Sequence, residues 1–161
     1  MPQVRDRRDD VELPSKAPTH VRPVVLATLA VPVHPSAERM AIDSSIEAGV
    51  PLVIANLIPL PPYPRTIVLV GAQATTLPHE EALDELRETA RRAANLGVKT
   101  ELLRVHTRHA VNALLEILHE RDAGLLVLGP HLGKVGRARF RRTARRVRRE
   151  ADCLVWVAPD G

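Results

Sequence analysis

The chain has few aromatic residues, a single cysteine and no long apolar run, and each shortage excludes a class of protein. Tyr63, Phe140 and Trp156 are the only aromatic residues, so single-stranded nucleic acid has almost no surface on which to stack. Cys153 has no partner for an internal disulfide and does not make a zinc site by itself. No run approaches the roughly 18 apolar residues of a membrane span. The first twenty residues are too charged for a signal peptide, so we expect a cytoplasmic protein without a membrane span.

Positive charge is concentrated in one segment. Residues 134–150 contain nine Lys or Arg residues and one Glu, so this segment carries +8, whereas the whole chain carries +4 and its remainder −4. Nucleic-acid binding by the whole surface is therefore disfavoured, because it needs several phosphate contacts along one face. A nucleic-acid- or anion-associated module that uses only the arginine helix at 137–149 stays open as an alternative. A steep loss of binding with salt would identify it.

Apolar runs and helical patterns alternate along the rest of the chain. Residues 1–20 mix charges and prolines without an apolar period, which predicts a flexible tail before one α/β domain at 21–161. The expected strands are 24–28, 51–58, 98–105, 124–128 and 154–157, and the expected helices are 37–48, 79–95, 110–119 and 137–151. This order predicts a single doubly wound, mostly parallel sheet of five strands.

Several local expectations concern the ends of these elements. Ser36 is the expected N-cap of the first helix, and Gly49 is expected to end it. The side chains available for the buried face of this helix are Met40, Ile42, Ile46 and Ala48. Residues 106–109 form an expected turn. Residues 66–70 follow a proline-rich linker and either pair as an extra edge strand or lie over the sheet.

The main candidate site is the loop from Gly129 to Gly136. It leaves the carboxyl end of an apolar strand and begins the arginine helix, which is where open α/β sheets bind ligands. Unpaired N–H groups and the helix dipole favour an anion there. Gly133 allows close backbone approach, and Lys134 and Arg142 supply positive charge. The alternative is that the glycines permit a tight turn and nothing binds.

Other chemistry has less support in the sequence. His106, His109 and His131 fall near the same sheet edge, but no Asp, Glu or Cys stands at ligand spacing beside them, so no metal site is expected. No Gly-x-Ser-x-Gly motif is present, and no catalytic residue is assigned. Cys153 precedes a strand and is expected to be a small buried residue.

Three stretches of the chain carry a resemblance to a known family. They are Glu101–Leu115, Asp122–Gly129 and Ala151–Val157, with the basic helix between the last two. In these stretches, and in element order from Pro23 to Pro159, the chain resembles the universal stress protein family. The resemblance implies an adenine nucleotide alpha hydrolase-like α/β fold and a dimer. In the nucleotide-binding branch it also implies ATP or another adenine nucleotide with Mg.

The chain departs from the motif of that nucleotide-binding branch, which is Gly-x-x-Gly, nine residues, and then Gly-Ser or Gly-Thr. Three residues separate Gly129 from Gly133. The place of the third glycine falls at Thr143 when counted on from Gly133, and near Arg141 and Arg142 when counted back from Cys153. Leu29 stands where the nucleotide binders tend to have an aspartate, and magnesium-phosphate chemistry usually needs such a carboxylate. The candidate cofactor-binding residues are Thr28, Leu29, Gly129, His131, Gly133, Lys134, Gly136, Arg142 and Thr143.

The resulting functional expectation is a stress-response or regulatory binding domain without catalytic turnover, with a degenerate nucleotide cleft. The alternative is an ATP-binding universal stress protein with slow or no hydrolysis. In the resembled family the last strand commonly pairs with its twin, so the resemblance implies a homodimer through Leu154–Val157. The apolar strand would otherwise leave an open edge of the sheet.

Overall fold

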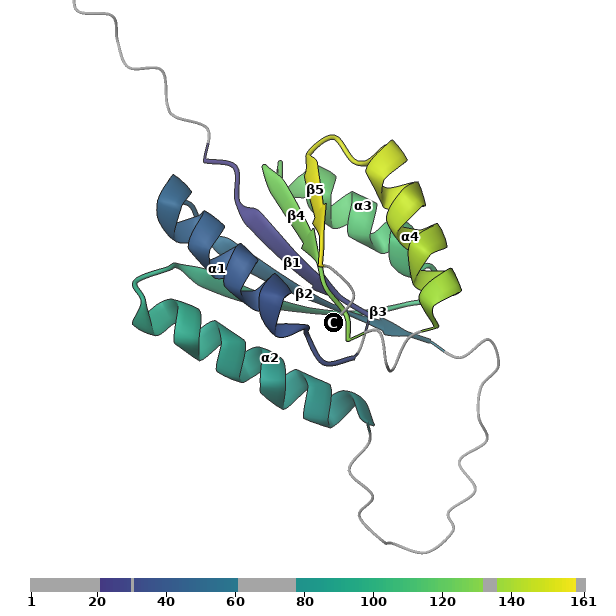
Figure 1. Ribbon diagram of the computed structural model, residues 1–161, viewed down its shortest axis with the longest axis horizontal. Coiled ribbons are helices and arrows are strands. Elements are labelled where there is room, and N and C mark those ends of the chain that lie inside the picture. The colour runs from purple at the N-terminus through teal and green to yellow at the C-terminus, as the bar shows by residue number, and fades with distance from the viewer. Residues whose placement is uncertain (1–20, 30, 61–77, 132–135, 159–161) are drawn as a thin grey trace, which may run out of the picture.

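The computed structural model describes residues 21–29, 31–60, 78–131 and 136–158, and in these ranges five strands and four helices alternate (Figure 1). They are β1 (Val24–Thr28), α1 (Pro35–Ala48), β2 (Leu52–Pro59), α2 (Pro78–Asn95), β3 (Thr100–Thr107), α3 (Ala110–Glu120), β4 (Leu125–Leu128), α4 (Arg137–Glu150) and β5 (Leu154–Val157). The strands pair in the order β3-β2-β1-β4-β5, and every pairing is parallel. The prediction of a doubly wound parallel sheet is confirmed.

The two faces of the sheet are covered by different helices (Figure 1). Helices α1 and α2 pack on one face, where Leu26 and Ile54 are buried, and α3 and α4 pack on the other, where Val25 and Val53 are buried. β1 is buried along its whole length, as its uninterrupted apolar run predicts for a central parallel strand. None of the helices in the described ranges is long and apolar enough to cross a membrane.

Helix α1 begins earlier than the sequence predicts. His34, not Ser36, is its N-cap: the ring nitrogen Nδ1 of His34 accepts a hydrogen bond from the N–H of Ser36 at 3.2 Å. Pro35 occupies the first turn, where its fixed φ fits a helix and its missing N–H leaves no donor unsatisfied. The prediction that Gly49 ends the helix is confirmed, since it adopts the left-handed conformation with φ of 63°.

The buried face of α1 is made of small residues and Ile42. The buried side chains are Ala37, Ala41, Ile42 and Ser45. Of the four residues expected on this face, Ile42 is buried and Met40 is partly buried, but Ile46 is 47% exposed and Ala48 is also exposed. The expectation was wrong there because α1 approaches the sheet closely, and that approach selects small side chains.

The third strand continues further than expected. β3 runs to Thr107, so His106 belongs to the strand and not to a turn. Backbone pairing with β2 explains the extension, because the register continues from Thr100 opposite Leu52 to Thr107 opposite Pro59. The possible extra strand at 66–70 lies outside the described residues.

Candidate functional site

The site lies where the chain changes direction across the sheet. β1 and β4 are neighbours at the centre, and β1 leads to α1 on one face whereas β4 leads to α4 on the other. Diverging connections of this kind leave a crevice at the carboxyl ends of the strands, and such crevices bind ligands in open α/β sheets.

The first part of the Gly129–Gly136 loop is tied to the segment that follows β1. The N–H of His34 donates to the carbonyl oxygen of Gly129 at 2.7 Å, and the N–H of His131 donates to that of Pro32 at 2.9 Å. The rings of His34 and His131 lie beside each other, with centroids 6.1 Å apart. The His131 N–H is therefore already bonded within the protein instead of being open to a phosphate.

Gly129 has a packing role that is visible in the structure. A Cβ atom at this position would lie 2.0 Å from the Cβ of Ala37, well inside van der Waals contact. Ala37 is fully buried in the first turn of α1. The glycine therefore permits α1 to rest against the end of β4.

A pocket of about 360 Å³ opens at the carboxyl ends of the strands, between the first turn of α3 and the flank of α4 that faces α3. Its lining residues are Leu29, Val31, Pro59, His109, Ala110, Val111, Asn112, Gly136, Arg139, Thr143 and Arg146. The volume falls within the usual range of small-molecule sites. The pocket therefore has an apolar wall from the loop after β1 and from α3, and a polar wall from α4.

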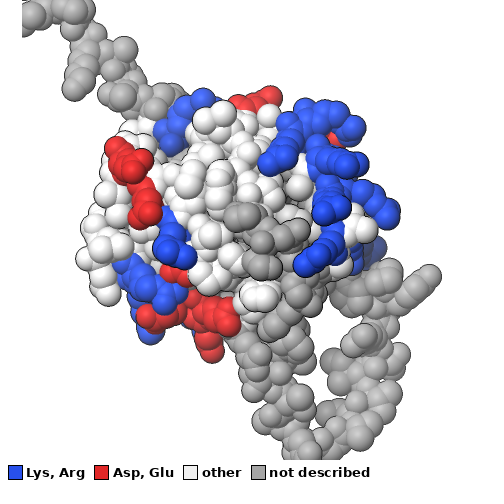
Figure 2. All heavy atoms as spheres, in the orientation of Figure 1, with Lys and Arg blue, Asp and Glu red and all other residues white. Residues whose placement is uncertain are grey.

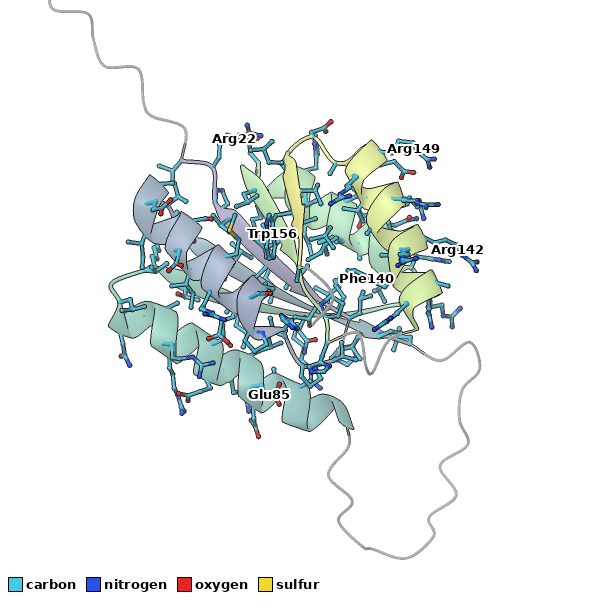
Figure 3. All side chains as sticks on the ribbon, viewed as in Figure 1. Arg22, Glu85, Phe140, Arg142, Arg149 and Trp156 are labelled. Carbon is cyan, nitrogen blue, oxygen red and sulfur yellow. The ribbon has the colours of Figure 1, made fainter. Side chains whose placement is uncertain are left out.

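The structure brings together three of the candidate residues. Leu29, Gly136 and Thr143 line the pocket, whereas Gly133 and Lys134 lie outside the described residues. Thr28 is buried, and its hydroxyl donates to Oδ1 of Asn56 at 3.0 Å. Figure 3 shows Arg142 on the outer side of α4, directed away from the sheet.

Arg139 and Arg146 are the pocket residues that sequence reasoning missed. They flank Thr143 at helical spacings of four and three, which places the three side chains on one flank of α4. That spacing is the signal that could have found them. The packing stripe of Phe140, Ala144 and Val147 is buried, which sets the rotation of the helix.

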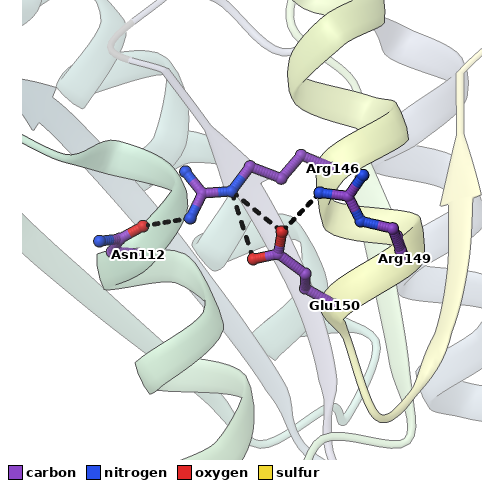
Figure 4. Close-up of polar contacts among 4 residues, drawn as sticks. All are labelled: Asn112, Arg146, Arg149 and Glu150. Carbon is purple, nitrogen blue, oxygen red and sulfur yellow. Dashed lines mark hydrogen bonds and ion pairs between the residues drawn. The ribbon is translucent and has the colours of Figure 1, made fainter.

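Two arginines of α4, Arg146 and Arg149, form ion pairs with the carboxylate of Glu150 (Figure 4). Nε of Arg146 and Nη2 of Arg149 lie 3.2 Å and 2.9 Å from Oε1 of Glu150, and Nη2 of Arg146 donates to Oδ1 of Asn112 at 2.8 Å. Hydrogen bonds from Arg149, which has the larger effect, and from Arg146 lower the pKa of Glu150 below its ordinary value of 4.5. Arg139 lines the pocket and makes no hydrogen bond or ion pair with any described residue.

The pocket suits an anion better than a metal ion. None of its described lining residues is an Asp or Glu, and no group of three or more His, Cys, Asp or Glu residues in the described ranges could hold a metal. Both helices that border it begin there, at Ala110 and Arg137, and neither has a side-chain hydrogen bond at its N-cap. Unsatisfied N–H groups and the positive ends of two helix dipoles therefore add to the charge of Arg139.

A parallel sheet with helices on both faces and a pocket at the carboxyl ends of its central strands defines a doubly wound α/β domain. The family model described as the Universal stress protein family matches residues 20–159, and the chain belongs to this family. No curated protein sequence matches the chain.

Solved structures of the family have the same fold. A universal stress protein from Burkholderia pseudomallei is 20% identical, with a TM-score of 0.63 over 89% of this chain and 99% of that one. One from Archaeoglobus fulgidus is 20% identical, with a TM-score of 0.59 over 84% and 97%. A universal stress protein in complex with cAMP is 22% identical, with a TM-score of 0.60 over 89% and 100%. At these identities the likeness shows the shared fold alone.

Proposed function

We propose that this chain is a regulatory binding domain that takes an adenine nucleotide in the pocket between α3 and α4 and does not hydrolyse it. One observation carries the proposal: at the start of two helices, the pocket combines an apolar wall with Arg139, which pairs with no residue that the structure describes. Structures with cAMP, dAMP and AMP among the similar universal stress proteins support the choice of ligand.

The two walls fit the two halves of a nucleotide. Leu29, Val31 and Val111 offer apolar surface to a base. Arg139 and the first N–H groups of α3 offer charge and hydrogen-bond donors to a phosphate. Thr143 lies between Arg139 and Arg146 on α4, where its hydroxyl can bond a ribose or phosphate oxygen.

The same lining argues against hydrolysis. A magnesium ion bound to phosphates needs oxygen ligands, usually a carboxylate of the protein, to hold it in place. The described lining has none, and Leu29 stands at the end of β1 where a carboxylate would reach the pocket. The residues present therefore fit the nucleotide and do not fit the ion.

Calorimetric titration of the full chain with AMP, and with ATP in the presence and absence of Mg²⁺, tests this function. We expect binding that Mg²⁺ does not strengthen, with no release of phosphate. Arg139→Ala should weaken binding about tenfold, because it removes a charge-assisted hydrogen bond from a partly enclosed site. Arg142→Ala, on the outer side of the same helix, is the matched control and should change binding less than about twofold.

Two outcomes of this titration would contradict the proposal. The first is that none of the nucleotides gives heat. The second is that the two variants lose the same affinity, which would mean that the arginines act only through the overall charge of α4.

We also propose that two copies pair through β5. This strand is at the edge of the sheet, and its Leu154 is 74% exposed. The N–H groups of Leu154 and Ala158 donate to Gly124 and Leu128, so in the alternating pattern of a strand those of Val155 and Val157 point to the open edge. The exposed apolar residue and these unpaired groups favour the addition of a second strand.

Val155→Pro should convert the dimer to a monomer in sedimentation velocity runs. The substitution removes an outward N–H but leaves the hydrogen bonds to β4, which is why proline is tolerated on edge strands. A thermal unfolding curve checks that the variant is folded. A wild-type protein that sediments as a monomer, or a folded variant that stays dimeric, would contradict pairing through β5.

A further inference from the structure

We infer that two copies paired through β5 form a groove between their α4 helices, and that this groove binds a linear polyphosphate anion. The inference rests on the proposed pairing of two copies, because each copy supplies one wall of the groove. Three exposed arginines make up the charged part of each wall, Arg141, Arg145 and Arg148, here called the arginine row. None of them lines the nucleotide pocket, so the inference does not depend on nucleotide binding.

The arginine row lies on the flank of α4 that is nearest to the open edge of the sheet. The row borders a hollow of about 250 Å³, which is completed by Phe140, Ala144, Val157 and Ala158. The opposite flank of α4, with Arg139 and Thr143, borders the nucleotide pocket together with α3. Since β5 is the last strand of the sheet, the row faces the edge at which the second copy is expected. Figure 2 shows the blue band of side chains that runs along α4.

Pairing through β5 places two arginine rows opposite each other. Edge strands of two identical copies pair antiparallel about a two-fold axis perpendicular to the sheet, and this operation leaves both α4 helices on the same face. The two helices therefore flank the seam between the copies, each with its row toward the other. Val155 and Val157 pack into the core on this face of β5, so they form an apolar floor between the rows.

The described carboxylates near the seam are too few to neutralise the rows. The ion pairs of Glu150 are with Arg146 and Arg149, and the arginine row makes no hydrogen bond or ion pair with any described residue. Asp152, exposed just before β5, supplies one carboxylate against three arginines, which leaves a charge of +2 per copy. Pairing alone thus brings like charges together, and an anion between the rows relieves their repulsion.

The shape and charge of the groove favour a thin chain that is negative on every side. Guanidinium groups bind phosphate oxygens through paired N–H groups, and here they approach from two opposite walls. Arg141 and Arg148 are separated by about 10 Å along the helix axis, so each wall can contact several consecutive phosphates. A linear polyphosphate has a charge on each unit and no bulky group between its charges. It therefore satisfies both rows at once.

Nucleic acid fits this groove less well. Phe140 is the only aromatic lining residue of the hollow, and it is 5% exposed, so the bases of a single strand have no surface on which to stack. A duplex would approach from outside and meet Arg142 and Arg149, which lie on the outer side of α4 (Figure 3). Acidic side chains gather over the end of the molecule that carries α1 and α2, so a long duplex would meet positive charge on α4 alone (Figure 2).

Fluorescence anisotropy with the full chain and an end-labelled polyphosphate of twenty units tests the inference. Arg141→Gln combined with Arg145→Gln should weaken binding at least about tenfold, because it removes two arginines from each wall. Arg142→Gln combined with Arg149→Gln is the matched control. It removes the same charge from the outer side of α4 and should weaken binding less than about threefold (Figure 3). An equal loss in the two double variants would overturn the inference.

The salt dependence of binding reports how many arginines contact the anion. If each contact contributes about −0.7 to the slope of log affinity against log salt, as on single-stranded nucleic acid, two rows predict a slope of about −4. Val155→Pro, which we expect to be monomeric, keeps one row and should show a slope of about −2. A folded monomeric variant with the full slope would show that one helix is sufficient, which would overturn the groove with two walls.

Polyphosphate should also stabilise the dimer, because a ligand that needs both walls binds the paired form more tightly. In sedimentation velocity runs it should lower the dissociation constant of the wild-type dimer at least about tenfold. Without polyphosphate and at low salt, Arg141→Gln combined with Arg145→Gln should itself lower this constant about threefold, since the rows then repel each other less. The dimer of this variant should no longer respond to polyphosphate.

The outcomes separate the groove from the pairing on which it rests. A wild-type dimer whose dissociation constant does not change with polyphosphate overturns the groove and leaves the pairing through β5 intact. A wild-type chain that stays monomeric with and without polyphosphate overturns both. A twelve-base-pair DNA duplex that binds more tightly than polyphosphate, and loses affinity with the Arg141 and Arg145 substitutions, would make nucleic acid the partner of the rows and overturn the choice of ligand.

Discussion

Replacing Gly129 with alanine is expected to lower the free energy of unfolding by about 3 kcal/mol, because the new methyl group overpacks the contact between β4 and α1. Its Cβ would lie 2.0 Å from the Cβ of Ala37 and 3.4 Å from that of Ala158. The contact cannot open freely, since the N–H of His34 holds the carbonyl oxygen of Gly129 at 2.7 Å. Urea unfolding followed by circular dichroism measures the loss.

Two further variants attribute this loss to the contact. Gly136→Ala is the matched control, because no atom lies within 4 Å of a Cβ built there, and it should cost about 0.5 kcal/mol at an N-cap position. Ala37→Gly destabilises by itself, since it weakens a helix and leaves a small cavity. Combined with Gly129→Ala it should recover at least about 1 kcal/mol relative to the sum of the single changes. If the two changes in the free energy of unfolding simply add, the overpacking between Gly129→Ala and Ala37 is not the cause of the loss.

The glycine illustrates what the sequence could and could not reveal. That Gly129 ends a strand and begins a turn was predictable, because an apolar run stops there and glycine follows. Its true constraint is a contact with Ala37, which is far away in the sequence and touches Gly129 only after β1 and β4 become neighbours. Long-range contacts of this kind leave no local pattern.

The order and type of the elements could be predicted because they depend on local periodicity. The runs that became β1 and β2 are apolar except for Thr28 and Asn56, and the stripe of Phe140, Ala144 and Val147 fixed the buried side of α4. The errors in the bounds lie at element ends, where pairing with a neighbouring strand lengthened β3 and Pro35 brought forward the start of α1. A further error concerned the buried face of α1, where Ile46 and Ala48 are exposed.

The candidate site could be predicted only in part. Its place at the carboxyl end of the sheet follows from the alternation of strands and helices, and Leu29, Gly136 and Thr143 do line the pocket. The choice among the arginines required knowing which flank of α4 faces α3. Arg139 and Arg146 lie on that flank, whereas Arg142 points outward, and the sheet order decides this.

Thr28→Val is expected to lower the free energy of unfolding by about 2 kcal/mol, because it leaves a buried amide without its hydrogen bond. Thr28 and Asn56 lie opposite each other in the register of β1 and β2, and both are almost fully buried, at 1% and 0% exposure. The Thr28 hydroxyl donates to Oδ1 of Asn56 at 3.0 Å, while Nδ2 of Asn56 has no hydrogen-bond partner among the residues that the structure describes. Without the hydroxyl, neither side-chain polar atom of Asn56 has a partner in the described ranges.

A second threonine provides the control for the Thr28 substitution. Thr89 is buried in α2, and its hydroxyl donates to the backbone oxygen of Glu85, one turn earlier. Thr89→Val should change stability by less than about 0.5 kcal/mol, since a helical carbonyl keeps its main-chain bond. Equal losses of unfolding free energy at the two positions would mean that removal of the hydroxyl, and not the unsatisfied amide of Asn56, determines the effect.

Removing the amide as well should restore stability. Combining Thr28→Val with Asn56→Leu replaces both polar partners by apolar side chains of similar size and also removes the unsatisfied Nδ2, so its stability should return to within about 1 kcal/mol of the wild type or exceed it. Urea unfolding of the four proteins of this cycle measures the coupling. A double variant less stable than Thr28→Val alone would show instead that Asn56 stabilises the end of β2 through a contact other than Thr28. In that case the polar pair of Thr28 and Asn56, which joins β1 to β2, would be a required part of the fold.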